Sequence, residues 1–470
     1  MSDIIGRLYE IDCLKEYTTS PTSEFIVVYG RRRVGKTFLI RETFNNDFHF
    51  YLTGKSNSTT ELQLQNFVTV FKEYNPKKKI DIPTNWHEAF QLLIKYLEKL
   101  KAKQKLVFID ELPWFDTHKS DFLSAFEHFW NHWASARKDI KLIVSGSAAS
   151  WIIKKLLKSK GGLHNRVTQK IKLYPFTLQE TELFLQAKNI RWSKYQIIEA
   201  YMVMGGIPFY LNTIKRGKSA TQNIDDIFFK DNGILKDEFE NLYASLFKFP
   251  ENYIALVKAI SKKTKGLTRE EILKTAKLPN GGGITKILNE LEECGFIRKY
   301  KPFDKLQRDA VYQLVDFYTL FYFNFILDKD VSKDNYWAIT SKTPQYRAWS
   351  GYAFEQVCCL HLPQLKKELG ISGIMSNAAS WRNKNAQIDL LIDRNDQVIN
   401  ICEMKFSINT FTIDKKYADN LRNKIGSFIA QTNTKKSVFV TMVTTYGITN
   451  NAYASQLIDN SLTMESLFVK

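Results

Sequence analysis

The 470-residue chain has little cysteine and lacks the apolar segments expected of secreted or membrane proteins. Its five cysteines form no C-x-x-C pair and are too few and too irregularly spaced for a disulfide framework. The N-terminus has no basic segment followed by an apolar one, as a secretory signal requires. Polar residues interrupt the stretch 311–327, which we expect to be a buried helix and not a membrane span. These absences favour a cytoplasmic protein without a membrane partner.

Acidic residues are also fewer than basic residues. Lys and Arg number 67 against 49 Asp and Glu, which gives a formal net charge of +18. Such a balance favours polyanionic partners, either DNA or an acidic protein surface, but charge alone does not choose between them. No internal repeat or low-complexity tract stands out, so linkers should be short. At about 150 residues per domain, the length predicts roughly three domains.

The segment from Gly30 to Thr37 fits the P-loop pattern G-x-x-x-x-G-K-[ST] and directly follows the apolar run Phe25 to Tyr29. In this pattern the backbone amides and a helix N-terminus surround the phosphates of ATP, while the lysine, here Lys36, neutralises their charge. Thr37 is expected to hold Mg²⁺. The predicted nucleotide-binding residues are Gly30, Arg31, Arg32, Arg33, Val34, Gly35, Lys36, Thr37 and Asp110.

Two acids follow the apolar run 106–109, which is typical of a buried parallel strand that delivers carboxylates at its C-terminal edge. Asp110 would accept a hydrogen bond from Thr37 or from water around Mg²⁺. Glu111 would polarise the water that attacks the γ-phosphate. The pattern therefore predicts a Walker B site in which Thr37 and Asp110 hold the metal and Glu111 is catalytic.

Two further features near this site allow a functional and a plain interpretation. Ser145 and Ser147 end a third apolar run, where they would sense the γ-phosphate or simply form a polar turn. Arg166 belongs to a segment, 151–172, with seven Lys or Arg and no acid. That segment is either a solvated face or the source of an arginine finger, Arg166, for a neighbouring subunit's nucleotide.

Together these patterns resemble the archaeal-type AAA ATPases of the STAND clade. The residues that carry the resemblance are Gly6-Arg7-x-x-Glu10-Ile11, the P-loop, Asp110-Glu111, Ser145-Gly146-Ser147, Arg166, Leu173-Tyr174-Pro175-Phe176 and Gly205-Gly206-Ile207-Pro208. The resemblance implies a helical lid in which Gly205 to Pro208 couple to the nucleotide state. The physical alternative is a helix that ends at a Gly-Gly-x-Pro turn.

Residues 253–314 have the pattern of a winged helix. Helical periodicity covers 253–261, 268–276 and 284–294, and two strand-like segments, 296–300 and 310–314, flank a basic connection that holds Lys301, Lys305 and Arg308. The third helix is expected to expose an acidic face that includes Glu290, which phosphates would repel. We therefore prefer domain docking to DNA reading for this helix, although the wing remains able to touch the DNA backbone.

A second acidic site is predicted near the C-terminus. Asp389 lies in the strand-like segment 387–392, and Glu403 and Lys405 face one side of the next strand, 398–405. Glu355 lies in the apolar stripe of a helix and needs a partner. The four residues resemble the acidic and basic positions of PD-(D/E)XK nucleases, which implies that Asp389 and Glu403 hold a metal and that all four are catalytic.

The predicted architecture is α/β. It comprises a P-loop ATPase core (1–175), a helical lid (176–245), a winged helix (246–330) and a PD-(D/E)XK nuclease-like domain (331–470). We expect an ATPase whose nucleotide state controls a nuclease-like domain that acts on DNA. A homo-oligomer is a possible form of this protein. The alternative is an ATP-dependent signalling switch without nuclease activity. A purely structural nucleic-acid binder would leave the P-loop and Asp110-Glu111 unexplained.

Overall fold

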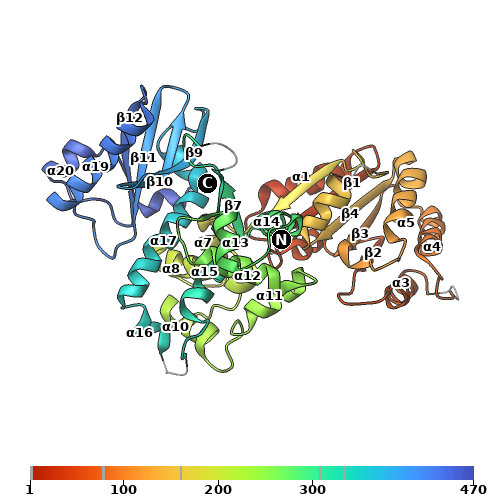
Figure 1. Cartoon of the computed structure of the whole chain (residues 1–470). Helices are drawn as coiled ribbons and strands as arrows, with labels where there is room; N and C mark the ends of the chain where they lie inside the picture. Colours follow the sequence, from red (N-terminus) through yellow and green to blue (C-terminus); the bar gives the residue numbers. More distant parts are fainter. Residues whose placement is uncertain (1–3, 77–79, 159–160, 306–308, 332–334) are drawn as a thin grey trace. The chain divides into compact units, whose positions relative to one another are not determined.

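The computed structural model describes residues 4–76, 80–158, 161–305, 309–331 and 335–470. The chain divides into two compact units. The first is Met1–Pro175 with Ala244–Lys248, and the second is Phe176–Tyr243 with Phe249–Lys470. In Figure 1 the first unit runs from red to yellow, and most of the second runs from green to blue. The described part of the chain has no helix long and apolar enough to cross a membrane.

A parallel five-stranded sheet, in the order β2-β3-β4-β1-β5, forms the centre of the first unit. Every residue of the strand β4 is buried, as expected for a sheet covered on both faces. The strand β2 had no counterpart among the predicted strands. The strands are β1 Glu24–Gly30, β2 Phe50–Thr53, β3 Lys105–Asp110, β4 Ile140–Gly146 and β5 Gln169–Leu173.

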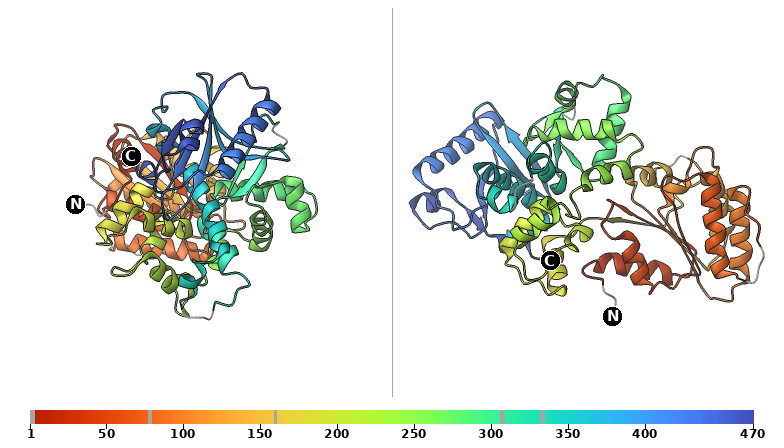
Figure 2. Two further views of the ribbon diagram at one scale, coloured as in Figure 1. Left: turned by 90° about the vertical axis from the view of Figure 1, so that its left-hand side faces the viewer. Right: turned by 90° about the horizontal axis from the view of Figure 1, so that it is seen from below.

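Helices cover both faces of this sheet. Figure 2 shows α1 on one side and the orange helices on the other. On the latter side, Trp86 and Phe122 pack edge to face within a large aromatic core. The helices of this unit are α1 Leu8–Thr19, α2 Lys36–Thr43, α3 Thr60–Tyr74, α4 Trp86–Lys99, η1 Leu112–Phe115, α5 Phe122–His128, η2 Phe129–Trp133, η3 Ala134–Ala136, α6 Ala149–Ile152 and η4 Ile153–Leu157.

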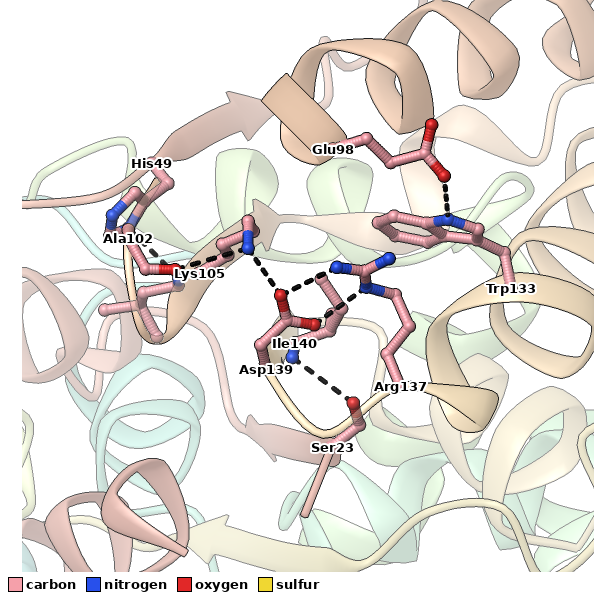
Figure 3. A network of polar contacts seen from close by, with 10 residues as sticks. Ser23, His49, Glu98, Ala102, Lys105, Trp133, Arg137, Asp139 and Ile140 are labelled. Atoms are coloured by element: carbon pink, nitrogen blue, oxygen red, sulfur yellow. Dashed lines mark hydrogen bonds and ion pairs between the residues drawn. The ribbon is translucent and has the colours of Figure 1, made fainter. Parts of the chain in front are cut away.

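Asp139 ties together the N-terminal ends of the strands, at the sheet edge opposite the P-loop (Figure 3). Arg137 donates from Nε at 2.7 Å and from Nη2 at 2.8 Å to the two carboxylate oxygens, and Lys105 forms an ion pair with one of them. These cations hold the pKa of Asp139 well below its usual range. The Ile140 amide donates to Ser23 Oγ at 3.2 Å, which joins the same corner to the loop before β1.

The second unit begins with a helical segment, which is called the lid below after the role predicted for it from the sequence. Its helix α8 ends at Gly205, whose φ is 62°, and Pro208 starts α9, so the Gly-Gly-x-Pro segment is a turn between helices. A Cβ on Gly206 would lie 1.9 Å from the Phe176 carbonyl oxygen, so only glycine fits there. The lid comprises α7 Leu178–Ala187, α8 Lys194–Met204, α9 Pro208–Leu211, α10 Ala220–Ile224, η5 Asp225–Phe229 and α11 Glu238–Leu246.

Three helices and a small antiparallel sheet, β6-β8-β7, follow the lid. As the sequence predicts, Thr268 and Glu271 form a capping box at the start of α13. The expectation that Glu290 is exposed is wrong, because it is 7% exposed and accepts a hydrogen bond from Tyr253 of α12. The elements are α12 Pro250–Ser261, β6 Leu267–Thr268, α13 Arg269–Ala276, α14 Gly282–Glu293, β7 Ile297–Tyr300 and β8 Val311–Leu314.

The stretch 311–327 is not one buried helix, as its composition suggests. Its first four residues form β8, which pairs with β7, and Asp316 then caps the buried helix α15, where its side chain accepts from the Thr319 amide at 3.0 Å. The polar residue that interrupts the apolar run is therefore the boundary between a strand and a helix.

A mixed five-stranded sheet, β13-β12-β11-β10-β9, forms the C-terminal part. Strands β9, β10 and β11 are antiparallel, and β11, β12 and β13 are parallel. The remaining elements are α15 Phe317–Phe325, α16 Tyr336–Thr340, α17 Pro344–Leu360, α18 Leu362–Glu368, β9 Ser376–Arg382, β10 Gln387–Arg394, β11 Val398–Lys405, α19 Lys415–Thr432, β12 Ser437–Thr444, α20 Ala452–Leu457, β13 Asn460–Leu462 and η7 Met464–Leu467.

Candidate functional site

The P-loop connects the end of β1 to the start of α2. A Cβ on Gly30 would lie 2.2 Å from the Leu173 carbonyl oxygen of the neighbouring strand β5, so a side chain cannot be accommodated there. Gly35 directly precedes Lys36, the first residue of α2. The free amides of this helix N-terminus therefore face the loop, as phosphate binding requires.

Lys36 is 4% exposed and lies across the loop that it follows. Its Nζ donates to the carbonyl oxygens of Gly30 at 3.2 Å and Arg31 at 3.0 Å, and to Ser147 Oγ at 2.9 Å. A buried ammonium held by neutral acceptors is well placed to exchange them for an anion. The lysine thus has the position that the P-loop pattern predicts.

Asp110 lies beside Thr37 at the C-terminal edge of the sheet. Thr37 Oγ1 donates to Asp110 Oδ2 at 2.9 Å, and Ser145 donates to the other carboxylate oxygen. Burial raises the pKa of Asp110, so a nearby cation would favour its charged form. Adjacent hydroxyl and carboxylate oxygens suit Mg²⁺, which would offset phosphate charge when bound.

Ser147 joins Glu111 to Lys36. Its amide donates to Glu111 Oε2 at 3.0 Å, and its hydroxyl donates to Glu111 Oε1 at 2.5 Å while accepting from Lys36. Glu111 has a left-handed backbone, with φ of 50°, at the sharp turn after β3. The strand β4, which contains Ser145 and ends directly before Ser147, lies between β1 and β3, so both serines reach the two acids.

Arg166 is exposed in the turn before β5. Because β5 runs parallel to β1, the start of β5 lies at the edge of the sheet opposite the P-loop. Arg166 therefore lies away from the nucleotide site of its own chain. The position fits a solvated face, and an arginine finger from here could reach only the nucleotide of another subunit.

The structure brings the four predicted C-terminal residues together. Strand β10 bulges between Ile388 and Leu391, which places Asp389 at an irregular point of the sheet, and bulges re-aim side chains. Burial, and then the charge of Asp389, raise the pKa of Glu355 to about 8. Burial also raises the pKa of Asp389. The charge of Glu403 raises this pKa further, and the charge of Lys405 lowers it.

The sequence did not predict the partners of this cluster. Lys424 forms an ion pair with Glu403 at 2.5 Å, Tyr417 donates to the other Glu403 oxygen at 3.1 Å, and Gln387 donates to Asp389. Tyr417 and Lys424 are seven residues apart, on one face of α19. This spacing was the only sign in the sequence that Tyr417 and Lys424 could contact the same acid. Among the described residues, no three His, Cys, Asp or Glu side chains converge as metal ligands do.

Comparison with known proteins identifies the first site. Residues 5–214 match a family described as an ATPase domain predominantly from Archaea. The N-terminal part of the chain is therefore similar to ATPase domains of the archaeal type. Residues 322–417 match a second family, described as archaeal and bacterial proteins of unknown function. An uncharacterized protein of Methanocaldococcus jannaschii is 26% identical over 426 residues, covering 89% of this chain and 91% of the relative.

One solved structure supports the fold assignment. The Walker-type ATPase of Pyrococcus abyssi superposes with a TM-score of 0.50 at 19% identity, over 68% of this chain and 96% of that chain. A STAND protein with a tetratricopeptide repeat sensor from Pyrococcus horikoshii matches 78% of this chain and 50% of its own length at 18% identity. Its TM-score is 0.31, so that match supports no statement about function. The prediction of a nucleotide-binding P-loop ATPase is confirmed.

Proposed function

We propose that the chain is a Mg²⁺-dependent ATPase whose nucleotide state controls a nuclease-like C-terminal domain that acts on nucleic acid. Within it, residues 246–330 serve as a winged helix that docks on the C-terminal domain. Thr37 and Asp110 hold the metal, Glu111 orients the attacking water, and Ser147 senses the γ-phosphate through Lys36. The supporting observation is that the lid and the C-terminal domain pack as one compact unit.

His361 forms a buried part of that packing. It is 1% exposed, its Nε2 accepts from the Leu178 amide at the start of α7 at 2.9 Å, and its Nδ1 lies 2.8 Å from the Val357 carbonyl oxygen in α17. One imidazole therefore joins the first lid helix to the helix that carries Glu355. A movement of the lid would be transmitted to the acidic cluster.

An aromatic contact adds a second connection between the lid and the C-terminal domain. Tyr195 of α8 stacks on Phe406, with ring centroids 4.9 Å apart, and on Tyr446 at 5.9 Å. Phe406 directly follows Lys405, the last residue of β11. Any displacement of α8 would therefore act on the end of the strand that carries Glu403 and Lys405.

Plasmid cleavage with Mg²⁺ or Mn²⁺ tests the nuclease part of the proposal. We expect the parent chain to nick or cut DNA, and Asp389→Ala to abolish cleavage while ATP hydrolysis persists in the other unit. Asp419→Ala is the matched control, because Asp419 is an exposed acid of the same sheet-and-helix region and pairs with Arg422 alone among the described residues. Cleavage that survives Asp389→Ala would contradict the assignment.

One observation favours the alternative, a signalling switch without nuclease activity. Glu403 is already neutralised by Lys424 and bonded by Tyr417, and the described acids do not converge on a metal position. A parent chain that hydrolyses ATP but cleaves no DNA with either cation would establish the switch and leave the acidic cluster as a binding or structural element.

Assembly into a homo-oligomer is a further part of the proposal, because Arg166 can serve only another subunit's nucleotide. We expect sedimentation analysis with ATP to show assembly, and Arg166→Ala to lower ATP turnover only under conditions in which the parent assembles. Equal turnover of Arg166→Ala and the parent in the assembled state would exclude the finger role and leave Arg166 on a solvated face.

A further inference from the structure

A basic groove lies in the second unit between the connection that follows β7 and the β9–β10 hairpin. It has a volume of about 550 Å³, and its walls include Lys305 on one side and Arg382, Asn383 and Lys384 on the other. Gln431, near the end of α19, also lines the groove. The third predicted cation of the connection, Arg308, lies outside the described residues.

The three cations of this groove are available for a ligand. Lys305, Arg382 and Lys384 are exposed, and none of them has a side-chain hydrogen bond or an ion pair to any other described residue. The groove also contains one acid, Asp309. The net balance is positive, so the groove favours an anion that spans several charges.

The two walls are held together by backbone and core contacts. The Phe303 amide donates to the Ser380 carbonyl oxygen of β9 at 2.7 Å. The Phe303 ring packs 5.4 Å from that of Phe428, in a cluster that also contains Trp381. The groove is therefore a composite feature that neither wall would form alone, and its cations are positioned before any ligand arrives.

The acidic cluster opens beside this groove. A neighbouring cavity of about 150 Å³ shares Pro302, Val311 and Arg382 with the groove and is lined by Glu355 and Asp389. Arg382 thus lies at the junction of the basic groove and this carboxylate-containing cavity, which Lys265 and Arg298 also line. A strand held by its phosphates in the groove would carry the adjoining part of its backbone to the carboxylates.

We propose that the groove binds the sugar-phosphate backbone of single-stranded nucleic acid, through Lys305, Arg382 and Lys384, and delivers it to the cavity that contains Glu355 and Asp389. This inference rests on the proposed function only for the use made of that cavity. The groove's volume admits one backbone and not a duplex. The amide of Gln431 can both donate and accept, which suits the mixed donor and acceptor edges of bases better than the carboxylates of an acidic peptide. Asn383 adds an NH₂ donor, because its side-chain oxygen already accepts from the Asn385 and Ala386 amides at 2.8 and 2.7 Å.

Binding of a fluorescein-labelled oligothymidylate, measured by anisotropy in EDTA over a salt series, tests the proposal without requiring cleavage or ATP hydrolysis. Each phosphate contact on a single strand contributes about 0.7 to the slope of log K against log salt. Loss of three contacts should therefore reduce the slope by about two. The test variant combines Lys305→Gln, Arg382→Gln and Lys384→Gln.

The control variant removes the same charges from exposed positions of the same unit, outside the groove. Its substitutions are Lys342→Gln, Arg347→Gln and Lys416→Gln. The proposal predicts that the control keeps the parent's slope and affinity while the groove variant loses both, with unchanged thermal unfolding midpoints for the two variants. Equal losses in both variants, or no binding by the parent at low salt, would overturn it.

Two further outcomes separate the alternatives. A polyglutamate peptide that displaces the oligonucleotide at equal charge concentration would overturn the nucleic-acid assignment in favour of an acidic peptide. Groove-dependent binding by a parent chain that cleaves nothing with Mg²⁺ or Mn²⁺ would support the groove and refute only the proposed nuclease function.

Discussion

Glu111→Gln separates nucleotide binding from water activation, because the substitution keeps the shape of the side chain and removes its charge. In the structure the Ser147 amide donates to one Glu111 oxygen at 3.0 Å, and the Ser147 hydroxyl donates to the other at 2.5 Å. A glutamine can keep its oxygen on the Ser147 amide and turn its NH₂ toward Oγ, which already accepts from Lys36. The local geometry therefore survives the substitution.

The size of the effect follows from these contacts. Exchanging charge-assisted for neutral hydrogen bonds costs about 1–2 kcal/mol locally, and neither bond involves the phosphates, so nucleotide affinity should change by less than about tenfold. Loss of a general base lowers turnover by about 100- to 10,000-fold, or roughly 3–5 kcal/mol of transition-state stabilisation. We expect ATP to remain bound without being hydrolysed.

A fluorescent ATP analogue measures binding, and phosphate release measures turnover. Asp116→Asn is the matched control, since Asp116 is a carboxylate of the same loop whose side chain accepts from Trp151 Nε1 at 2.8 Å. The control should keep turnover within about twofold, as expected for a residue away from the reacting groups. Equal turnover by Glu111→Gln and the parent would refute the assignment of Glu111 as the residue that activates water.

Three further predictions concern single residues. Lys36→Ala should weaken ATP binding by at least about 100-fold, because it removes the charge that meets the phosphates, and calorimetry would detect undiminished binding as a contradiction. Asp139→Asn should lower the urea-unfolding free energy of the first unit by about 2 kcal/mol, because it weakens the ion pairs with Arg137 and Lys105. An unchanged unfolding free energy would show that these ion pairs do not stabilise the unit. Burial lowers the pKa of His361 to about 4, so its neutral form stabilises the second unit above about pH 6.5, and about 3 kcal/mol should be lost as pH falls through 4. His361→Gln should flatten this acid-side dependence of the unfolding free energy, and an unchanged profile would contradict it.

The ATPase site could be predicted from sequence because its chemistry is local. The P-loop residues are consecutive, and a short apolar run in the sequence predicts the strand that ends at Asp110. Once β1 and β3 belong to one parallel sheet, their C-terminal ends meet at one edge, and Thr37 reaches Asp110 at 2.9 Å. The link from Ser147 to both Glu111 and Lys36 required the strand order, which places β4 between the other two.

The rest depended on contacts between distant segments, which no periodicity reveals. The pairing of Glu403 with Lys424 depends on how α19 lies on the sheet. Glu290 has a polar neighbourhood in the helix, and only the approach of Tyr253 from α12 makes its burial tolerable. The strand at the start of 311–327 was predicted as part of the wing, at 310–314, while the continuous hydropathy of the same stretch favoured a single helix. The boundary between strand and helix was visible in Asp316 followed by Thr319, which is a capping pattern.

The sequence Gly-Gly-x-Pro in the lid segment does more than end a helix, as Gly206 shows. The turn alone requires Gly205, with its positive φ, and Pro208 at the start of α9. Gly206 has a different role, since its carbonyl oxygen accepts from the Phe176 amide at 2.6 Å and its missing Cβ leaves room for the Phe176 backbone. Phe176 is the first residue after the ATPase core, so this contact attaches the lid turn to the start of the second unit. Coupling through this turn would then require a rigid attachment and not a flexible hinge, because any side chain at position 206 would displace the backbone on which the lid rests.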